Sequence, residues 1–319
     1  MTTSSTVDGS IGRTPAPGRR LPTGRRRKSV TSSGWWPLLF VGPLMAGITV
    51  FYLWPVARTI YFSFTKWGVF GGSRWTGLAN YERLASDPDV GRALVNTVVY
   101  TCIALAGIPI ALLLAELMNR PGLRFRQVYR ALYFLPYVTM PAAISMIWRI
   151  IFNGDFGVLN WGLGHVGMSG HHWLSTEWLA LITVAGVGVW LEIGLFVIIF
   201  SAAINSLPSD VYEAAALDGA GRWRTFRSIT VPLLTPSIFF VTVITVIAGF
   251  QLFDLLYVLL GPDNPVADKT QSLVFLFYTD AFVNNDKGYG AALAVVIMGL
   301  VGLVTVVQFR LQRRWVEHV

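Results

Sequence analysis

Long apolar stretches alternate with short polar segments along most of this chain. Six of the stretches reach the roughly 20 residues that a helix needs to cross the apolar core of a bilayer. They lie at 35–56, 93–117, 128–152, 178–203, 233–260 and 290–309. The pattern predicts an all-α, polytopic membrane protein with six transmembrane helices.

Composition supports the same class of protein. The chain has 319 residues, of which 54% are hydrophobic and 13% are charged. Soluble domains carry about 25% charged residues, so much of this chain is expected to meet lipid rather than water. A single cysteine, Cys102, excludes a disulfide within the chain and leaves the redox compartment undefined.

The positions of the basic residues predict the orientation of the helices. Seventeen of the 25 Lys and Arg residues lie in the segments 1–34, 118–130, 204–231 and 310–319. Cytoplasmic loops are enriched in Lys and Arg, so these segments, and with them both termini, are expected in the cytoplasm. The predicted organisation is a basic, disordered N-terminus at 1–34, a transmembrane domain at 35–310 and a cytoplasmic tail at 311–319.

The net charge of +8 invites a nucleic-acid interpretation. The charge is concentrated beside the predicted helices, where it fixes topology and meets anionic membrane lipid. The distribution therefore favours membrane lipid as the partner and argues against nucleic acid.

The segment 204–232 is the longest predicted cytoplasmic loop and the most patterned one. Pro208 suits the start of a helix, and Asp210 and Glu213 have the spacing of a capping box. Gly219 is expected to end this helix in a left-handed conformation. A second short helix is expected at 222–229, ending before Pro232.

Two interpretations of this loop remain open from its physics. The helix pair could lie on the membrane surface, or it could dock a cytoplasmic partner. The small side chains Ala214, Ala215 and Ala216 permit close approach of a partner, and the acidic Glu213 and Asp218 would be repelled by anionic headgroups. These features favour docking.

The loop resembles the EAA loop of ABC importer permeases of the carbohydrate-uptake branch. The pattern E-A-A-x-x-D-G-A-x-x-x-x-x-F-x-x-I-T-L-P is matched at ten positions and departs at Val231. The resemblance implies that the loop carries the coupling helix, which inserts into a cleft of an ATPase subunit. The implied coupling residues are Glu213, Ala214, Ala215, Asp218, Gly219, Ala220, Arg222, Trp223 and Phe226.

The resemblance extends over most of the chain. The segment 75–81 is similar to the family's G-L-x-N-Y element, and 96–97 is similar to its N-T element. The segment 130–136 is similar to the family's entrance to the third helix, and 253–259 to its F-D-x-x-Y-V-L element. The turn at 260–262 departs from the family's T-x-G-G-P. The overall pattern is similar to the first of two unlike permeases in maltose-type and glycerol-phosphate-type importers.

That resemblance implies the fold and the partners. It implies the type I ABC importer permease fold in the plasma membrane of a prokaryote. It also implies a second, unlike permease subunit, an ATPase dimer and an extracytoplasmic solute-binding protein. Sugar, oligosaccharide, polyol and glycerol phosphate all remain open as solutes.

The chain shows no candidate catalytic or nucleotide-binding residues. None of its lysines completes a P-loop, so ATP and Mg²⁺ are expected on a partner subunit, with no cofactor and no enzyme activity in this chain. His165, His171 and His172 share one predicted external loop. A solvated loop is favoured there over a metal site.

Polar residues within the predicted helices are candidates for a solute path, because such residues are costly in lipid and face the protein interior. Glu192 lies in the fourth helix, and Gln251, Asp254 and Tyr257 lie in the fifth. Gln251 and Asp254 are expected on one helix face. The competing interpretation is hydrogen bonding between helices. At the level of function, the alternative is a six-span secondary transporter or channel, which leaves the patterned loop unexplained.

Overall fold

The computed structural model describes residues 36–67, 72–120, 122–261 and 264–316, in two compact units, 1–53 and 54–319. The predicted disordered segment 1–34 lies outside the described residues. In the first unit, α1 (Trp36–Ile48) is followed by the π-helical turn η2 (Thr49–Leu53). The second unit begins with α2 (Trp54–Ser63) and a short antiparallel hairpin of β1 (Thr65–Trp67) and β2 (Ser73–Trp75). The described part of the chain is otherwise helical.

Four helical stretches are long and apolar enough to cross a membrane. They are Leu39–Ser63, α4 (Pro88–Met118), α8 (Glu177–Asn205) and the part of α16 (Lys287–Val316) that ends at Gln312. They overlap the predicted stretches at 35–56, 93–117, 178–203 and 290–309. Two further helix pairs pass the same test if the two helices of each pair are taken together, although each pair is bent. Counting each bent pair as one span gives up to six spans among the described residues.

The stretch predicted as one helix at 128–152 is broken. It forms α5 (Arg126–Val138) and α6 (Pro141–Ile151), whose axes are bent by 96°. Met140 precedes Pro141 and has φ −54° and ψ 121°, as expected because proline disfavours helical backbone in the residue before it. The stretch predicted as one span is therefore not one continuous helix.

The stretch predicted as one helix at 233–260 is also broken. Helix α12 (Thr235–Phe250) ends at Gln251, and α13 (Asp254–Leu260) follows after an irregular segment. The hydroxyl of Ser272 donates a hydrogen bond to the carbonyl of Leu252 in that segment. This partner comes from a distant part of the chain, so hydropathy alone could not reveal the break.

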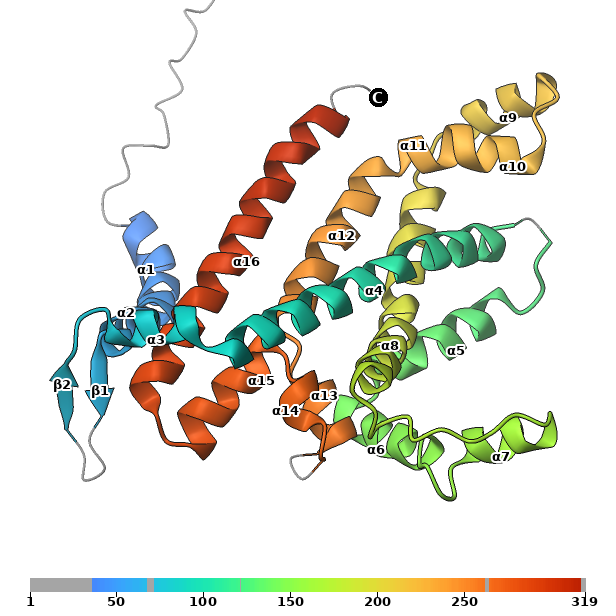
Figure 1. Ribbon diagram of the computed structural model, residues 1–319. Helices are drawn as coiled ribbons and strands as arrows, with labels where there is room; N and C mark the ends of the chain where they lie inside the picture. Colours follow the sequence, from blue (N-terminus) through green and yellow to red (C-terminus); the bar gives the residue numbers. More distant parts are fainter. Residues whose placement is uncertain (1–35, 68–71, 121, 262–263, 317–319) are drawn as a thin grey trace, which may run out of the picture. The chain divides into compact units, whose positions relative to one another are not determined.

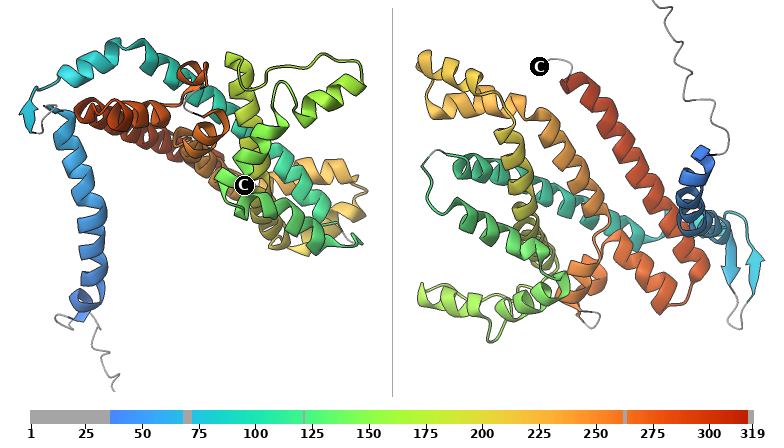
Figure 2. Two further views of the ribbon diagram at one scale, coloured as in Figure 1. Left: turned by 90° about the horizontal axis from the view of Figure 1, so that it is seen from below. Right: turned by 180° about the vertical axis from the view of Figure 1, so that it is seen from behind.

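Short helices complete the second unit. They are α3 (Ala79–Ser86), α7 (Val158–His165), α14 (Ala267–Thr270), α15 (Leu273–Tyr278) and the π turn η4 (Thr279–Val283). The core lies between α4 and α8, with α12 packed against α4 (Figure 1). Fully buried side chains such as Phe196 and Phe200 on α8 fill it. Helices α12 and α16 also pack against each other and lie side by side when the molecule is seen from behind (Figure 2).

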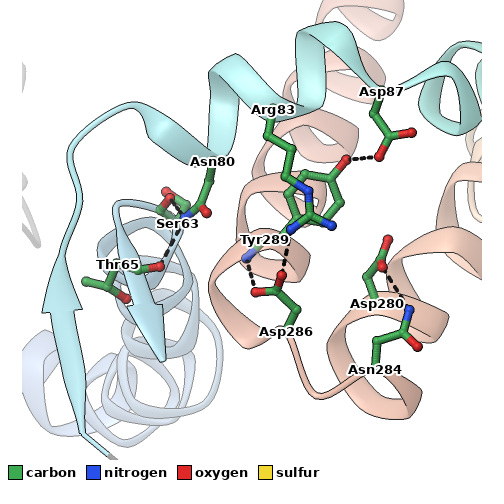
Figure 3. Close-up of polar contacts among 9 residues, drawn as sticks. All are labelled: Ser63, Thr65, Asn80, Arg83, Asp87, Asp280, Asn284, Asp286 and Tyr289. Carbon is green, nitrogen blue, oxygen red and sulfur yellow. Dashed lines mark hydrogen bonds and ion pairs between the residues drawn. The ribbon is translucent and has the colours of Figure 1, made fainter. Parts of the chain in front are cut away.

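Two of the family-like sequence elements have structural roles. The amide of Asn80 donates hydrogen bonds to the carbonyls of Ser63 (2.8 Å) and Thr65 (3.0 Å), which fixes α3 to the end of α2 (Figure 3). The amide of Asn96 donates to the carbonyls of Lys269 (2.8 Å) and Gln271 (3.0 Å). Both asparagines therefore join a helix to the backbone of another segment: Asn80 joins α3 to α2 and β1, and Asn96 joins α4 to the end of α14.

Candidate functional site

A helical hairpin follows α8, and residues 208–233 are called the coupling hairpin below. It contains α9 (Ser209–Leu217), α10 (Arg222–Thr225), the π turn η3 (Phe226–Thr230) and α11 (Val231–Leu233). Pro208 occupies the N-cap with extended backbone, as its sequence position indicates. No side chain caps this end of α9, so the capping box predicted from Asp210 and Glu213 is not formed.

The turn of the coupling hairpin is a Schellman motif. The amide of Ala220 donates to the carbonyl of Ala215 (2.9 Å), and the amide of Gly219 donates to the carbonyl of Ala216 (3.1 Å). Gly219 has φ +70°, a conformation that costs other residues about 1–2 kcal/mol. The Asp218-Gly219 pair thus ends α9 as the sequence predicts.

The second arm of the coupling hairpin is longer than predicted. It was expected to end before Pro232, but the helix passes through this residue to Leu233 and bends by 68° only where α12 begins. A π turn at Phe226–Thr230 immediately precedes Val231 and Pro232. Proline lacks an amide hydrogen and clashes with the carbonyl four residues earlier, and the wider π turn relieves that clash.

One contact anchors the coupling hairpin to the helices behind it, and two others hold its arms together. Phe226 is buried in an apolar cluster with residues of α4 and α8, including Leu112 and Phe200. The hydroxyls of Tyr212 and Thr230 lie 3.1 Å apart and join the two arms. Ala215 is buried between the arms. Of the coupling residues implied by the resemblance, Ala215 and Phe226 therefore face inward.

The opposite face of the coupling hairpin is open. Glu213, Ala214, Asp218 and Gly219 are exposed. Arg222 and Trp223 are also exposed and Ala220 is half-buried, but these three line the space between the hairpin and α4. Leu217 is 89% exposed, at the tip of α9. An apolar side chain exposed at this tip is free to contact a partner. Sequence reasoning missed Leu217, although its place directly before Asp218-Gly219 was the available signal.

A cavity of about 790 Å³ lies between the coupling hairpin and the end of α4. Leu113, Glu116 and Arg120 line it from α4, and Tyr212 and Trp223 line it from the hairpin. The hairpin and the end of α4 therefore face each other across an incompletely filled space beside the Phe226 contact.

Glu192 lies on α8, where its neighbours in sequence are apolar. Its Oε2 atom is buried and has no hydrogen-bond partner among the described residues. Buried polar atoms in native proteins are nearly always paired. An unpaired carboxylate oxygen inside a membrane helix is therefore a candidate contact for a ligand or a partner subunit.

The other path candidates lie where the fifth predicted helix breaks. Gln251 ends α12 and Asp254 begins α13, so the prediction that they share one helix face is wrong. Both side chains are exposed. Tyr257 stacks on Phe253, with ring centroids 5.3 Å apart, and borders Tyr278 at 5.4 Å. The structure thus gives Tyr257 a packing role and leaves Gln251 and Asp254 beside a broken helix.

Comparison with known proteins identifies the class. Residues 107–317 match the profile of the family described as "binding-protein-dependent transport system inner membrane component". The chain is 33% identical over 285 residues to an sn-glycerol-3-phosphate transport system permease protein, UgpA, of Agrobacterium fabrum, covering 88% of this chain and 96% of that one. It is 31% identical over 301 residues to a probable ABC transporter permease protein, YesP, of Bacillus subtilis, covering 92% and 96%.

Solved structures share the fold. A bacterial ABC transporter involved in import of the acidic polysaccharide alginate contains a chain that matches with a TM-score of 0.79 at 20% identity, covering 88% of this chain and 96% of that one. A second structure, of the alginate transporter with a pentasaccharide-bound periplasmic protein, matches with a TM-score of 0.79 at 19% identity.

A bundle of apolar helices that carries an anchored, outward-facing hairpin is the architecture of an importer permease. The chain belongs to the family of inner-membrane components of binding-protein-dependent transport systems. It is a multi-pass inner-membrane protein and the permease subunit of an ABC importer of the carbohydrate-uptake branch, which sets aside a secondary transporter or channel.

Proposed function

We propose that this chain forms one half of the path for a carbohydrate solute and that its coupling hairpin docks a separate ATPase on the cytoplasmic side. The observation that supports this most strongly is the construction of the hairpin. One face is anchored through Phe226, and the other presents Leu217 at 89% exposure beside Glu213. A rigid element of this kind transmits force from a partner to the helices.

The proposal requires partners that this chain does not contain. ATP and Mg²⁺ are bound by an ATPase dimer, and a second, unlike permease completes the path. A solute-binding protein delivers the solute on the opposite side. When the ATPases close, the two coupling hairpins approach each other and the permease halves rock between inward-open and outward-open states. Both termini of this chain then lie in the cytoplasm.

The solute class is proposed from the relatives and from the path residues. The named relatives transport sn-glycerol-3-phosphate and alginate, both acidic derivatives of polyhydroxy compounds. Glu192, Gln251 and Asp254 offer the oxygen and amide groups that bind hydroxyls, and broken helices such as α12 and α13 form binding sites in other transporters. We therefore propose a carbohydrate or polyol as the solute, bound through its hydroxyls at these residues; an acidic group on it must lie away from the carboxylates of Glu192 and Asp254.

The docking proposal is tested with Leu217→Arg and Glu213→Lys. Each change places a bulky cation on the open face of the coupling hairpin and leaves the anchoring residues intact. We expect the co-expressed ATPase to lose co-purification with either variant, while the amount of permease in the membrane stays unchanged.

The control is Leu78→Arg, since Leu78 is also exposed, at 61%, but lies at the start of α3. This variant should retain the ATPase. Recovery of the ATPase at the wild-type yield with Leu217→Arg and Glu213→Lys would refute the proposed docking surface.

A further inference from the structure

A small polar pocket lies at the end of α8 opposite to the coupling hairpin. Its volume is about 160 Å³, the share of about five water molecules. It is called the Arg149 pocket below. Three segments line it: the end of α6 with the residues after it, the segment before α8, and the end of α13 with the residues after it. The lining residues are, in that order, Arg149, Phe152, Asn153 and Gly154, then His172, Trp173, Leu174 and Ser175, then Leu260 and Asn264.

Two asparagines hold the walls of the Arg149 pocket in place. The Oδ1 atom of Asn153 accepts hydrogen bonds from the amides of Asp155 (2.9 Å) and Phe156 (3.0 Å). Asn264 donates to the carbonyl of Leu174 (2.9 Å) and accepts from the amide of Val266 (3.0 Å). Asn264 therefore joins the segment after α13 to the segment before α8, and Asn153 orders the segment after α6 locally.

Two glycines lie against the side chains of Arg149 and His172. A Cβ atom at Gly154 would lie 2.3 Å from Nδ1 of His172, and one at Gly261 would lie 3.3 Å from Nη1 of Arg149. Gly261 also has φ +80°. The guanidinium of Arg149 and the ring of His172 thus each lie against backbone that only glycine leaves open.

The donors of the Arg149 pocket are unused. Within the described residues, Arg149, His172 and Ser175 are exposed, and the guanidinium, the ring and the hydroxyl have no hydrogen-bond or ion-pair partner in the protein. No acidic side chain is among the residues that line the pocket. The nearby Glu177 is engaged by Lys269 at 3.9 Å. Ser175 also lies two residues before the start of α8, whose N-terminal end carries partial positive charge.

We infer that the Arg149 pocket binds an oxyanion, the phosphate or carboxylate group of an acidic solute. The planar fork of a guanidinium matches two oxygens of such a group, and His172 and Ser175 supply further donors. Phosphate and carboxylate fit the volume, whereas a disaccharide does not. That the bound anion belongs to the imported solute rests on the proposed import function. That the Arg149 pocket binds an anion does not depend on that function.

Direct binding of inorganic phosphate tests the inference. The full chain, purified with its co-expressed partners in a neutral detergent, is dialysed against radiolabelled phosphate at fixed pH. We expect saturable binding that Arg149→Gln weakens by about tenfold or more, because a charge-assisted hydrogen-bond pair is lost. The control Arg74→Gln changes an exposed arginine on β2 and should bind like the wild type. Absence of saturable binding, or equal binding by Arg149→Gln, overturns the inference.

Two further measurements make the result specific. Gly154→Ala should weaken phosphate binding by displacing His172, with the melting temperature showing that the fold persists. Displacement by free glycerol phosphate supports a solute, whereas displacement only by phosphatidylglycerol vesicles assigns the pocket to lipid and overturns the solute assignment.

We expect Arg149→Gln to leave co-purification of the ATPase unchanged. Failure of this inference can therefore be distinguished from failure of the docking proposal.

Discussion

At the scale of single residues, the buried carboxylate of Glu192 is the strongest sign of a polar path through the helices. Its Oε2 atom is unpaired among the described residues, and a membrane helix that carries such a group accepts a cost of about 2.5–3.5 kcal/mol on insertion. The cost is offset when a solute hydroxyl or a partner subunit supplies the missing hydrogen bond.

Glu192→Gln tests the role of this carboxylate. The change keeps the shape and removes the charge, so the importer should assemble normally while its uptake rate falls by about tenfold. Uptake is measured in vesicles containing the complete importer, and Glu177→Gln serves as the control because its carboxylate lies at the start of α8 and pairs with exposed Lys269. Equal uptake by Glu192→Gln and wild type would remove Glu192 from the path.

The sequence predicted some residue roles and missed others. The left-handed Gly219 followed from the Asp-Gly pair, because local backbone chemistry decides such a turn. The exposure of Leu217 and the burial of Phe226 did not follow, since both depend on how the coupling hairpin packs against α4 and α8. The Arg149 pocket was equally hidden, because it joins residues more than 100 positions apart.

At the scale of elements, a polar network joins α3 to the start of α16. Arg83 forms an ion pair with Asp286 (2.7 Å) and lies over the ring of Tyr289, and the hydroxyl of Tyr289 donates to Asp87 (2.6 Å; Figure 3). Asp280, on η4, borders this network and is bonded by Asn284 (3.1 Å). Burial raises the pKa of the Asp280 carboxyl above its usual range, although the hydrogen bond from Asn284 and the charge of Arg83 oppose the shift.

The raised pKa predicts a pH-dependent effect of Asp280→Asn. The folded protein favours the protonated carboxyl, so its stabilising contribution is complete below the unfolded pKa of about 3.9 and is lost as the pH rises through the folded pKa. Asp280→Asn should therefore raise the melting temperature at pH 8, with a gain that shrinks toward pH 4. The exposed Asp268→Asn should show no such trend, and a gain independent of pH would contradict the prediction.

Element boundaries show where hydropathy reasoning stops. The continuous helices α4, α8 and α16 followed from uninterrupted apolar runs. The breaks at Met140 and at Gln251 did not, because long apolar runs flank both. Pro141 carried a usable local signal for the first break, whereas the second depends on the distant hydroxyl of Ser272.

At the scale of the whole molecule, the parts form one mechanical arrangement. Helix α8 connects the Arg149 pocket at its first residue to the coupling hairpin at its last, with Glu192 between them. A helix of 29 residues is about 43 Å long, enough to cross a bilayer. Movement of the hairpin can therefore reach the opposite side of the membrane through a single rigid element.

The central claim is that the tip of the coupling hairpin touches an ATPase, and cross-linking tests it most directly. Cys102 is the sole cysteine, so Cys102→Ser gives a cysteine-free chain in which Leu217→Cys introduces one thiol. After treatment of the assembled importer with a short thiol-to-amine cross-linker, we predict a covalent product of this chain with the ATPase. Phe156→Cys, 73% exposed beyond the other end of α8, should give no such product. An ATPase cross-linked equally from both positions, or from neither, would contradict the account.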